Sequence, residues 1–356
     1  MYTPCIKFVD SDSNVFQVRQ IANKIMVTSV PCGYDIAVRN MPTFYPFHAN
    51  GERLAVEVAT TGVAVWNGAA TQIPTPAKTG EQMQVVSTGA QDFGVAMYSG
   101  VATGGSSTTI EDSSANFTSL TLASNDHIIN LSNGTTSVIT SVDSDTQLTV
   151  EGFETEDGPT PTTSGHHYRI LDKSAGGTGV QVVLMHGIDT DGLPTRHIAL
   201  TSGLTPVNIG TASTIFVNDF HAAETGTGAA AAGIITCYKQ GAASTVYARI
   251  NAGTNSALQA RKMVPATHNL YVTGWSASCT AGKPVAIRLV ANSHEGVKYE
   301  GHFQVIDSVF LESSANNFRY EVPKKFSPLS IVGIMAYASQ AGANIAASFE
   351  GFLKPI

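Results

Sequence analysis

Short runs of alternating apolar and polar residues fill the chain from Gln259 to its end. Alternation with a period of two places one set of side chains on each face of a strand, so each run can bury one face and expose the other. Turn-forming segments such as 280–284 and 339–342 separate the runs. The pattern predicts an all-β C-terminal β-sandwich of jelly-roll type. The alternating positions are Leu270, Val272 and Gly274; Val285, Ile287 and Leu289; Phe303, Val305 and Asp307; Phe318, Tyr320 and Val322; Ile331, Gly333 and Met335; and Ile345, Ala347 and Phe349.

Strand-like runs also occur before residue 259, and the amino-acid composition of the chain changes between them. Residues 100–171 contain few large apolar side chains and many Ser, Thr and Gly residues. Because polar surface turns tolerate insertions, this stretch is predicted to be a small β module grafted into another β domain. The predicted organisation is an N-terminal arm (1–50), a discontinuous first β domain (51–99 and 172–240), the inserted small β module (100–171) and the C-terminal sandwich (241–356).

The first 50 residues give mixed signals. Val15, Val18, Ala22 and Ile25 have helical spacing, yet the same stretch is also compatible with a strand. Prolines then interrupt regular structure, and the segment at residues 41–48, MPTFYPFH, is typical of an extended aromatic arm. Such an arm either packs on its own domain or reaches a neighbouring subunit.

Composition narrows the class of partner. Charged residues make up 13% of the chain, and the formal net charge is −7, against a usual charged share of about 25%. No segment concentrates Lys and Arg, so nucleic acid is not an expected partner.

The amino terminus lacks a basic region before an apolar core, and the longest apolar run, residues 229–237, is short. Neither a secretory signal nor a membrane span is expected. A surface of small polar residues suits extended protein–protein contact.

Motifs that would carry chemistry are weak. The glycine runs at residues 176–179 and 226–228 lack the strand–loop–helix setting of a phosphate loop. The acidic runs that begin at Asp10 and Asp143 have an apolar residue where a calcium loop requires glycine. The four cysteines lie far apart and are expected to be buried free thiols. We therefore predict no catalytic, cofactor-binding or metal-binding residue, and we expect that the protein is not an enzyme.

One histidine pair is considered as a metal pair or pH switch. A two-residue turn at Asp191-Gly192 would place His186 opposite His197. Pro194 cannot donate a ladder hydrogen bond, which favours a longer loop and a different register.

Several segments resemble a virion structural protein of tailed bacteriophages. The segments are VWNGAATQIPTP, the strand SAGGTGVQVVLMHGID with its return IALTSG, the step Val264-Pro265-Ala266 before LYVTGWSAS, and the ending ASFEGFL. The insertion, with TTIEDSSANFTSL and SVDSDTQLTV, is similar to small β modules grafted into many phage proteins. The resemblance covers roughly residues 60–356.

The resemblance implies a non-enzymatic accessory protein of the capsid, neck or tail, assembled in the host bacterial cytoplasm into the virion. Its expected partners are copies of itself, as a homo-oligomer, and other virion proteins. The alternative is a receptor-binding module that grips a host-surface glycan, for which the insertion offers the aromatic residues Phe117, Phe153 and Tyr168. Aromatic anchors are common at subunit contacts, and the candidate interface residues are Phe44, Tyr45, Phe47 and Trp275.

Overall fold

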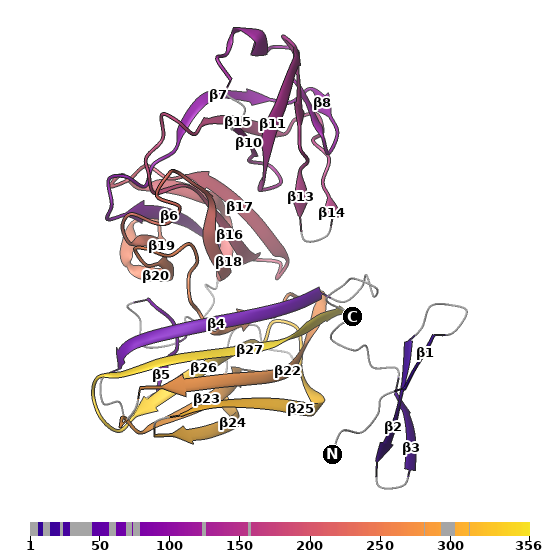
Figure 1. Ribbon diagram of the computed structural model, residues 1–356, viewed down its shortest axis with the longest axis vertical. Coiled ribbons are helices and arrows are strands. Elements are labelled where there is room, and N and C mark those ends of the chain that lie inside the picture. The colour runs from indigo at the N-terminus through magenta and orange to yellow at the C-terminus, as the bar shows by residue number, and fades with distance from the viewer. Residues whose placement is uncertain are drawn as a thin grey trace.

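The computed structural model of the protein consists almost entirely of antiparallel β-strands (Figure 1). It describes residues 6–9, 15–21, 24–28, 45–56, 62–68, 73, 79–122, 126–155, 158–280, 282–292, 303–312 and 314–356, with side chains from residue 45 onward except that of residue 55. Among these residues the helical element is one turn of 3₁₀ helix, Phe117–Ser119. The predicted all-β fold class is confirmed.

The C-terminal part of the chain is a sandwich of two antiparallel sheets. One sheet contains, in order, β25 (Ala315–Phe326), β22 (His268–Cys279), β27 (Ala343–Pro355) and β4 (Tyr45–Val56). The other contains β21 (Arg261–Met263), β26 (Ile331–Ala338), β23 (Val285–Asn292) and β24 (Gln304–Leu311), and β5 (Val63–Ala64) also pairs with β26. The first strand lies beside the last, and the chain passes repeatedly between the sheets, as in a jelly roll.

Alternate side chains of these strands fill the space between the two sheets. Leu270 and Val272 of β22, Ile287 and Leu289 of β23, and Phe349 of β27 are fully buried in one continuous core. Burying a side chain of this size stabilises the fold by roughly 1.5–3 kcal/mol. The alternation read from the sequence therefore holds for β23, for β27 and for β22 as far as Val272. In β26 the other phase enters this core, with Val332 and Ile334, while Ile331 and Met335 of the expected set pack in a separate cluster with Trp66 and Phe216.

The two edge strands depart in part from the expected pattern. Val305 of β24 and Val322 of β25 belong to alternating apolar sets, but they are 51% and 78% exposed. A bulge in β24 brings Ile306 onto the core instead. In β25, residues 320–323 lie opposite Thr273 alone, because the register shifts there. In β24 the extra residue reverses which side chains face the core. In β25 Phe318, Tyr320 and Phe326 keep the expected phase and pack on the core, and Val322 is exposed within the irregular stretch. No residue type in the sequence announces either irregularity.

One strand position of the jelly roll is built from two segments that are far apart in sequence. Both β5 and β21 pair with β26, β5 at residues 335–336 and β21 at residues 331–333. The two segments meet end to end, since the amide of Ala260 donates to the carbonyl of Val65 at 3.1 Å. The chain leaves the jelly roll after Val65 and returns at Ala260, so residues 66–259 are an insertion within a single strand.

The inserted segment forms a middle domain with its own curled sheet. The order is β17 (Pro194–Leu200), β16 (Val180–Asp189), β18 (Val207–Thr225), β6 (Glu81–Ser87), β19 (Ile235–Lys239) and β20 (Ala242–Ile250). Residues 255–257 join β18 to β20 through hydrogen bonds and β-bridges. Met83, Val183, Phe220 and Ile235 are buried in the enclosed core.

The loops at one end of the middle domain converge on the buried carboxylate of Asp92. Its Oδ1 accepts hydrogen bonds from the amides of Val180 and Ala232, each at 2.8 Å. Its Oδ2 accepts from the amide of Gly233 at 2.8 Å and from the hydroxyl of Ser87 at 2.5 Å. These hydrogen bonds offset the cost of taking the charge out of water, so Asp92 fixes the relative positions of three loops.

A smaller module is inserted in turn into the middle domain, at the end furthest from the jelly roll (Figure 1). Its core includes the fully buried Phe117, Phe153 and Ile128. Tyr168 donates its hydroxyl proton to Asp112 at 2.7 Å inside the same core. The sheet contains, in order, β7 (Val95–Val101), β15 (His167–Asp172), β10 (His127–Asn130), β11 (Thr135–Ser144), β12 (Gln147–Val150), β9 (Thr109–Glu111) and β8 (Gly104–Gly105), and β13 (Glu154–Thr155) pairs with β14 (Gly158–Pro159).

The predicted domain boundaries need three corrections. Residues 45–50, expected in the arm, are the first half of β4, and β5, expected in the first β domain, belongs to the jelly roll. Residues 242–250, expected in the C-terminal sandwich, form β20 of the middle domain. The edge position of β4 explains Pro46, since a proline is tolerated on a strand whose outer edge is free. The sequence pattern did not reveal that the jelly roll starts before the middle domain.

Three short strands form an N-terminal antiparallel sheet. They are β1 (Ile6–Val9), β2 (Val15–Ile21) and β3 (Lys24–Thr28), with β2 in the centre. The helical interpretation of this stretch is therefore wrong, and the strand interpretation is right.

A small ionic cluster joins the inserted module to the middle domain. His127 Nδ1 of β10 lies 2.6 Å from Glu224 Oε1 of β18, and Lys173 Nζ donates to Glu224 Oε2 at 3.1 Å. Burial raises the pKa of the Glu224 carboxyl, but its contacts with His127 and Lys173 outweigh this effect, and the net pKa is lowered. A carboxylate held ionised in this way stabilises the fold only while it stays ionised.

We predict that an N-terminal truncation is tolerated up to residue 44 and not up to residue 50. Deleting residues 1–44 leaves β4 complete and should change the free energy of unfolding by less than about 1 kcal/mol. Deleting residues 1–50 removes half of β4, including the partly buried Phe47, and should cost at least about 3 kcal/mol. Urea unfolding of both chains measures the difference. Equal stability of the two truncations would show that β4 is not part of the jelly roll.

We also predict that Glu224→Gln lowers the free energy of unfolding by about 1–3 kcal/mol at pH 7. The folded-state pKa is depressed, so the advantage of the wild type is present above the ordinary value of 4.5 and disappears as the pH falls through the folded value. Unfolding measured from pH 7 to pH 3 tests this. Glu151→Gln, on an exposed residue of the module, is the matched control and should differ little from wild type at any pH.

Candidate functional site

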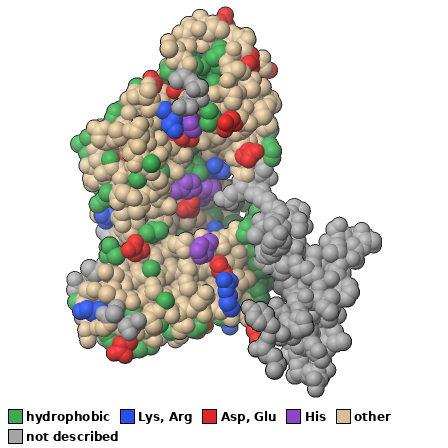
Figure 2. Space-filling view, in the orientation of Figure 1, with side chains coloured by type: hydrophobic (Ala, Val, Ile, Leu, Met, Phe, Trp, Pro, Cys, Tyr) green, Lys and Arg blue, Asp and Glu red, His purple; other side chains and the backbone are tan. Residues whose placement is uncertain are grey.

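A cleft of about 820 Å³ separates the middle domain from the jelly roll. Residues 45–50 of β4 line one side, and residues of β16 and β18, including His186, Asp219 and His221, line the other. Figure 2 shows histidine and acidic side chains at the boundary between the two bodies. The cleft is therefore a hollow in which titratable groups are concentrated.

Strand pairing brings His186, Asp219 and His221 together on one face of the middle-domain sheet. His186 and Asp219 are direct cross-strand partners of β16 and β18, and such pairs share a face. Asp219 and His221 are two residues apart on β18, so they also share that face. Phe220, between them, points to the opposite face and is fully buried in the core. A register shift between His186 and Gly187 marks a bulge next to the group, and bulges commonly re-aim side chains.

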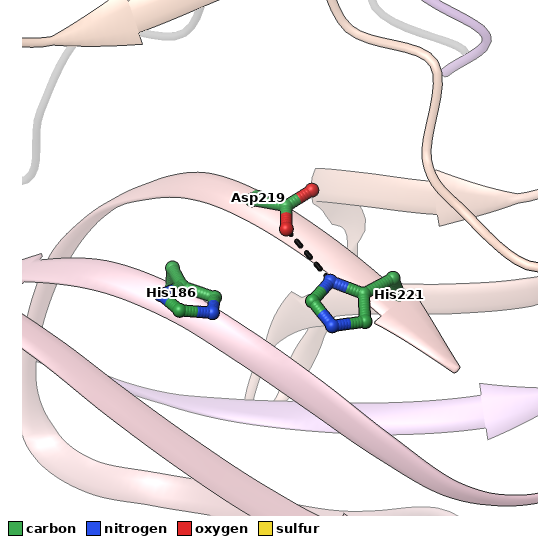
Figure 3. Close-up of side chains that lie close together, drawn as sticks. All are labelled: His186, Asp219 and His221. Atoms are coloured by element: carbon green, nitrogen blue, oxygen red, sulfur yellow. Dashed lines mark hydrogen bonds and ion pairs between the residues drawn. The ribbon is translucent and has the colours of Figure 1, made fainter. Parts of the chain in front are cut away.

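The three side chains are close enough to bind one ion. The nitrogen and carboxylate oxygen atoms that they offer all lie within 4.8 Å of one another. Asp219 Oδ2 lies 2.7 Å from His221 Nδ1, and the rings of His186 and His221 are stacked with centroids 5.9 Å apart (Figure 3). The Asp219 and His221 side chains are 46% and 33% exposed, so solvent reaches them from the cleft.

The Asp219 carboxyl is held in its ionised form. Burial raises its pKa, but the hydrogen bond with His221 and the electrostatic attraction of His221 and His186 outweigh burial, and the net pKa is lowered. At neutral pH the group is thus a carboxylate beside two imidazoles. Two histidine nitrogens with one carboxylate oxygen form a donor set typical of zinc and related transition-metal ions.

The Asp219–His221 pair resembles the carboxylate–histidine part of a hydrolytic site, and Ser256 is the nearest candidate nucleophile. Ser256 forms a β-bridge with His221 and lines the cleft. Within the part of the chain that the structure describes, no hydrogen bond joins the Ser256 hydroxyl to His221. A carboxylate–histidine pair needs a nucleophile within hydrogen-bond reach to act in this way. The arrangement therefore supports binding better than nucleophilic catalysis.

The histidine pair considered from the sequence does not form. His186 is opposite Arg196, and His197 is opposite Met185, so the two imidazoles leave their strands on opposite faces. The strands are joined by a loop longer than two residues, with Pro194 paired to Ile188, as the proline indicated. Sequence reasoning named His186 but missed Asp219 and His221. The Asp-x-His spacing was visible, but the pairing of β16 with β18 was not.

The proposed interface residues are separated in the structure. Phe44 lies outside the described residues. Tyr45 and Phe47 are half-buried in β4 and line the cleft, and their rings contact those of His268 and Phe349 edge to face. Trp275 is 2% exposed. It stacks on Phe318 at 4.6 Å and donates its indole proton to Asp307 at 3.2 Å, so it is a residue of the jelly-roll core with almost no surface to offer a second chain.

The remaining sequence motifs have structural partners. Asp143 accepts hydrogen bonds from Ser141 and Thr149, at 2.7 and 2.5 Å, on the surface of the module. Cys237 is buried, which raises the pKa of its thiol to about 12, and Cys279 is partly buried. Both are free thiols as expected, and Cys5 and Cys32 lie outside the described residues. None of the described residues form a helix with the length and hydrophobicity needed to span a membrane.

Neither a model of a known protein family nor the sequence of a curated protein matches the chain. Functional inference therefore rests on the residues of this protein.

Arg261 lies where the jelly roll and the middle domain meet. It lines the cleft and is 2% exposed. Its guanidinium lies 4.3 Å from the centre of the Trp66 ring, and its Nη2 donates to Gln259 at 3.0 Å and to the carbonyl of Tyr247. Burial lowers its pKa to about 9. Its Nε and Nη1 have no hydrogen-bond partner among the described residues. A buried cation with incomplete hydrogen bonding stabilises mainly through packing.

We predict that Arg261→Ala lowers the free energy of unfolding by about 2–4 kcal/mol, because it leaves a cavity beside Trp66. Arg261→Met preserves most of the volume and removes the buried charge, so it should cost roughly 1 kcal/mol or less. Chemical denaturation of the two variants gives the comparison. If the Met variant is as unstable as the Ala variant, the charge itself, and not its packing, holds the junction.

Proposed function

We propose that the protein is a non-catalytic structural component of a tailed-bacteriophage particle and that its jelly roll forms contacts between copies of the chain. The observation that carries this proposal is an apolar, unpaired edge on the jelly roll. The segments that resemble phage virion proteins lie in both the jelly roll and the inserted domains. The low share of charged residues, 13%, suits broad contacts between proteins.

The edge is made by β24 and β25, the last strands of their respective sheets. Their outer sides have no partner strand among the described residues. Phe310 is 68% exposed, Val322 is 78% exposed and Val305 is 51% exposed. An open strand edge with apolar side chains favours pairing with another chain.

The partner that we propose for this edge is the same edge of a second copy of the chain. A two-fold axis places the same patch on both subunits, so each exposed apolar side chain is used twice. Both edge strands lie on the side of the jelly roll away from the middle domain (Figure 1). Contacts made there leave the middle domain and the inserted module free to project outward from an assembly.

The glycan-binding alternative is weaker in this structure. Phe117, Phe153 and Tyr168, the aromatic residues considered for glycan contact, are 0%, 0% and 1% exposed. Sugar rings bind to exposed aromatic faces, and these side chains are instead the core of the module.

Sedimentation equilibrium tests the contact. We predict that the wild type self-associates and that Phe310→Ser combined with Val322→Ser weakens association at least tenfold, which is about 1.4 kcal/mol. Leu204→Ser, at a site 62% exposed in the middle domain, is the control and should associate like the wild type. A wild type that remains monomeric at high concentration would contradict the proposed contact.

Mass spectrometry of purified particles tests the location. Particles of a phage that encodes the chain should contain the protein in a fixed ratio to the other virion proteins. Its absence from washed, intact particles would contradict the structural role even if the isolated protein self-associates.

A further inference from the structure

We propose that His186, Asp219 and His221 bind a divalent transition-metal ion of the zinc class, with at least one coordination position open to the cleft. The proposal is independent of the role of the protein in a particle, because all three ligands belong to one chain and one domain. It rests on the geometry of the two strands, the chemistry of the donor set and access from the cleft.

The paired strands hold the backbone positions of His186, Asp219 and His221 close together without a bound ion. Both strands are flanked on two sides at the site, β16 by β17 and β18, and β18 by β16 and residues 255–257. The neighbouring side chains of Met185 and Phe220 are buried in the core on the opposite face. The donor atoms already lie within 4.8 Å of one another. Side-chain rotations that replace the hydrogen bond between Asp219 and His221 would close them around an ion with bonds of about 2.0–2.2 Å.

The donor set selects the class of ion. Calcium takes six to eight oxygen ligands, and magnesium is bound mainly by oxygen and water, so two imidazoles disfavour both ions. Zinc, cobalt, nickel and copper accept imidazole nitrogen together with a carboxylate oxygen. Three protein ligands leave a tetrahedral ion one further position, which is the arrangement of an open rather than a closed zinc site.

The open position faces the cleft and is reached by solvent. Asp219 and His221 are 46% and 33% exposed, and the opposite wall is formed by polar residues of β4, His48 and Asn50. Asn50 Nδ2 lies 3.2 Å from His48 Nδ1, so these two side chains contact each other across from the site. Water, or an oxygen donor on a molecule that enters the cleft, would complete the coordination. The cleft is thus suited to a ligand that binds the metal ion through an oxygen atom.

Binding of Co²⁺ and Zn²⁺ to the full-length protein tests the proposal. We expect one Co²⁺ per chain, with visible absorption bands of a four- or five-coordinate site, and displacement of Co²⁺ by one equivalent of Zn²⁺. Asp219→Asn keeps the shape of the side chain and should weaken binding at least tenfold. His186→Gln and His221→Gln should each do the same and should abolish the visible bands.

Two controls keep the result interpretable. His167→Gln, on an exposed histidine of the inserted module, should bind metal like the wild type. Thermal unfolding with and without Zn²⁺ separates lost binding from lost folding, since an ion that binds only the folded state raises the melting temperature. The three site variants should melt near the wild type without metal and lose the shift with metal. No stoichiometric binding by the wild type, or equal binding by the Asp219→Asn and His221→Gln variants, would overturn the assignment.

Discussion

The pairing of β5 and β21 with the same strand, β26, is the constraint on which the molecule depends. One strand of the jelly roll exists only if residues 63–65 and residues 260–263 meet end to end, because each segment alone is too short to complete the sheet. Everything between them must therefore fold with its two ends adjacent. The middle domain satisfies this requirement through the β-bridge between Trp66 and Gln259, directly next to the split strand. Arg261 then fills the space beside that bridge, between the two cores.

The same constraint repeats on a smaller scale. The inserted module leaves the middle domain through β7 and returns through β15, and these two strands pair with each other, so its ends are also adjacent. Insertions of this kind cost little, because closing the ends of an already folded unit adds no long flexible loop. The ionic cluster of His127, Lys173 and Glu224 restrains the module against the middle domain. Three bodies of one chain are thus joined by paired strands and buried side chains, and not by flexible linkers alone.

Much of the fold could be predicted from the local pattern of apolar and polar residues. The features that could not be predicted depend on which strands pair and in which register, and the local pattern does not show this. Alternation located the central strands β23 and β27, because Ile287 and Phe349 lie on strands with an unbroken phase. In β22 the phase reverses after Thr273, since Leu270 and Val272 are buried before it and Trp275 and Ala277 after it. It failed at Val305, where a bulge reverses the phase, and at Val322, which lies in a stretch of irregular pairing, and neither irregularity has a local signal. The assignment of β4 failed because prolines in and before the strand resemble a loop, whereas an edge strand accepts them. The outer insertion depends on contacts between residues nearly two hundred positions apart, Trp66 with Gln259 and Val65 with Ala260, and periodicity contains no information on such pairs.

The candidate site also depends on strand pairing that the local sequence pattern does not show. His186 was noticed from the sequence, and its partner was sought along the nearest hairpin, in His197. The structure pairs β16 with two strands, β17 and β18. The other residues of the candidate site come from β18, whose register with β16 shifts four times. A shift of one residue at either side of His186 would send Asp219 toward the buried core and Phe220 into the cleft. The proximity of the three side chains is therefore a property of the sheet register, and the bulge after His186 is as important to the site as the residues that form it.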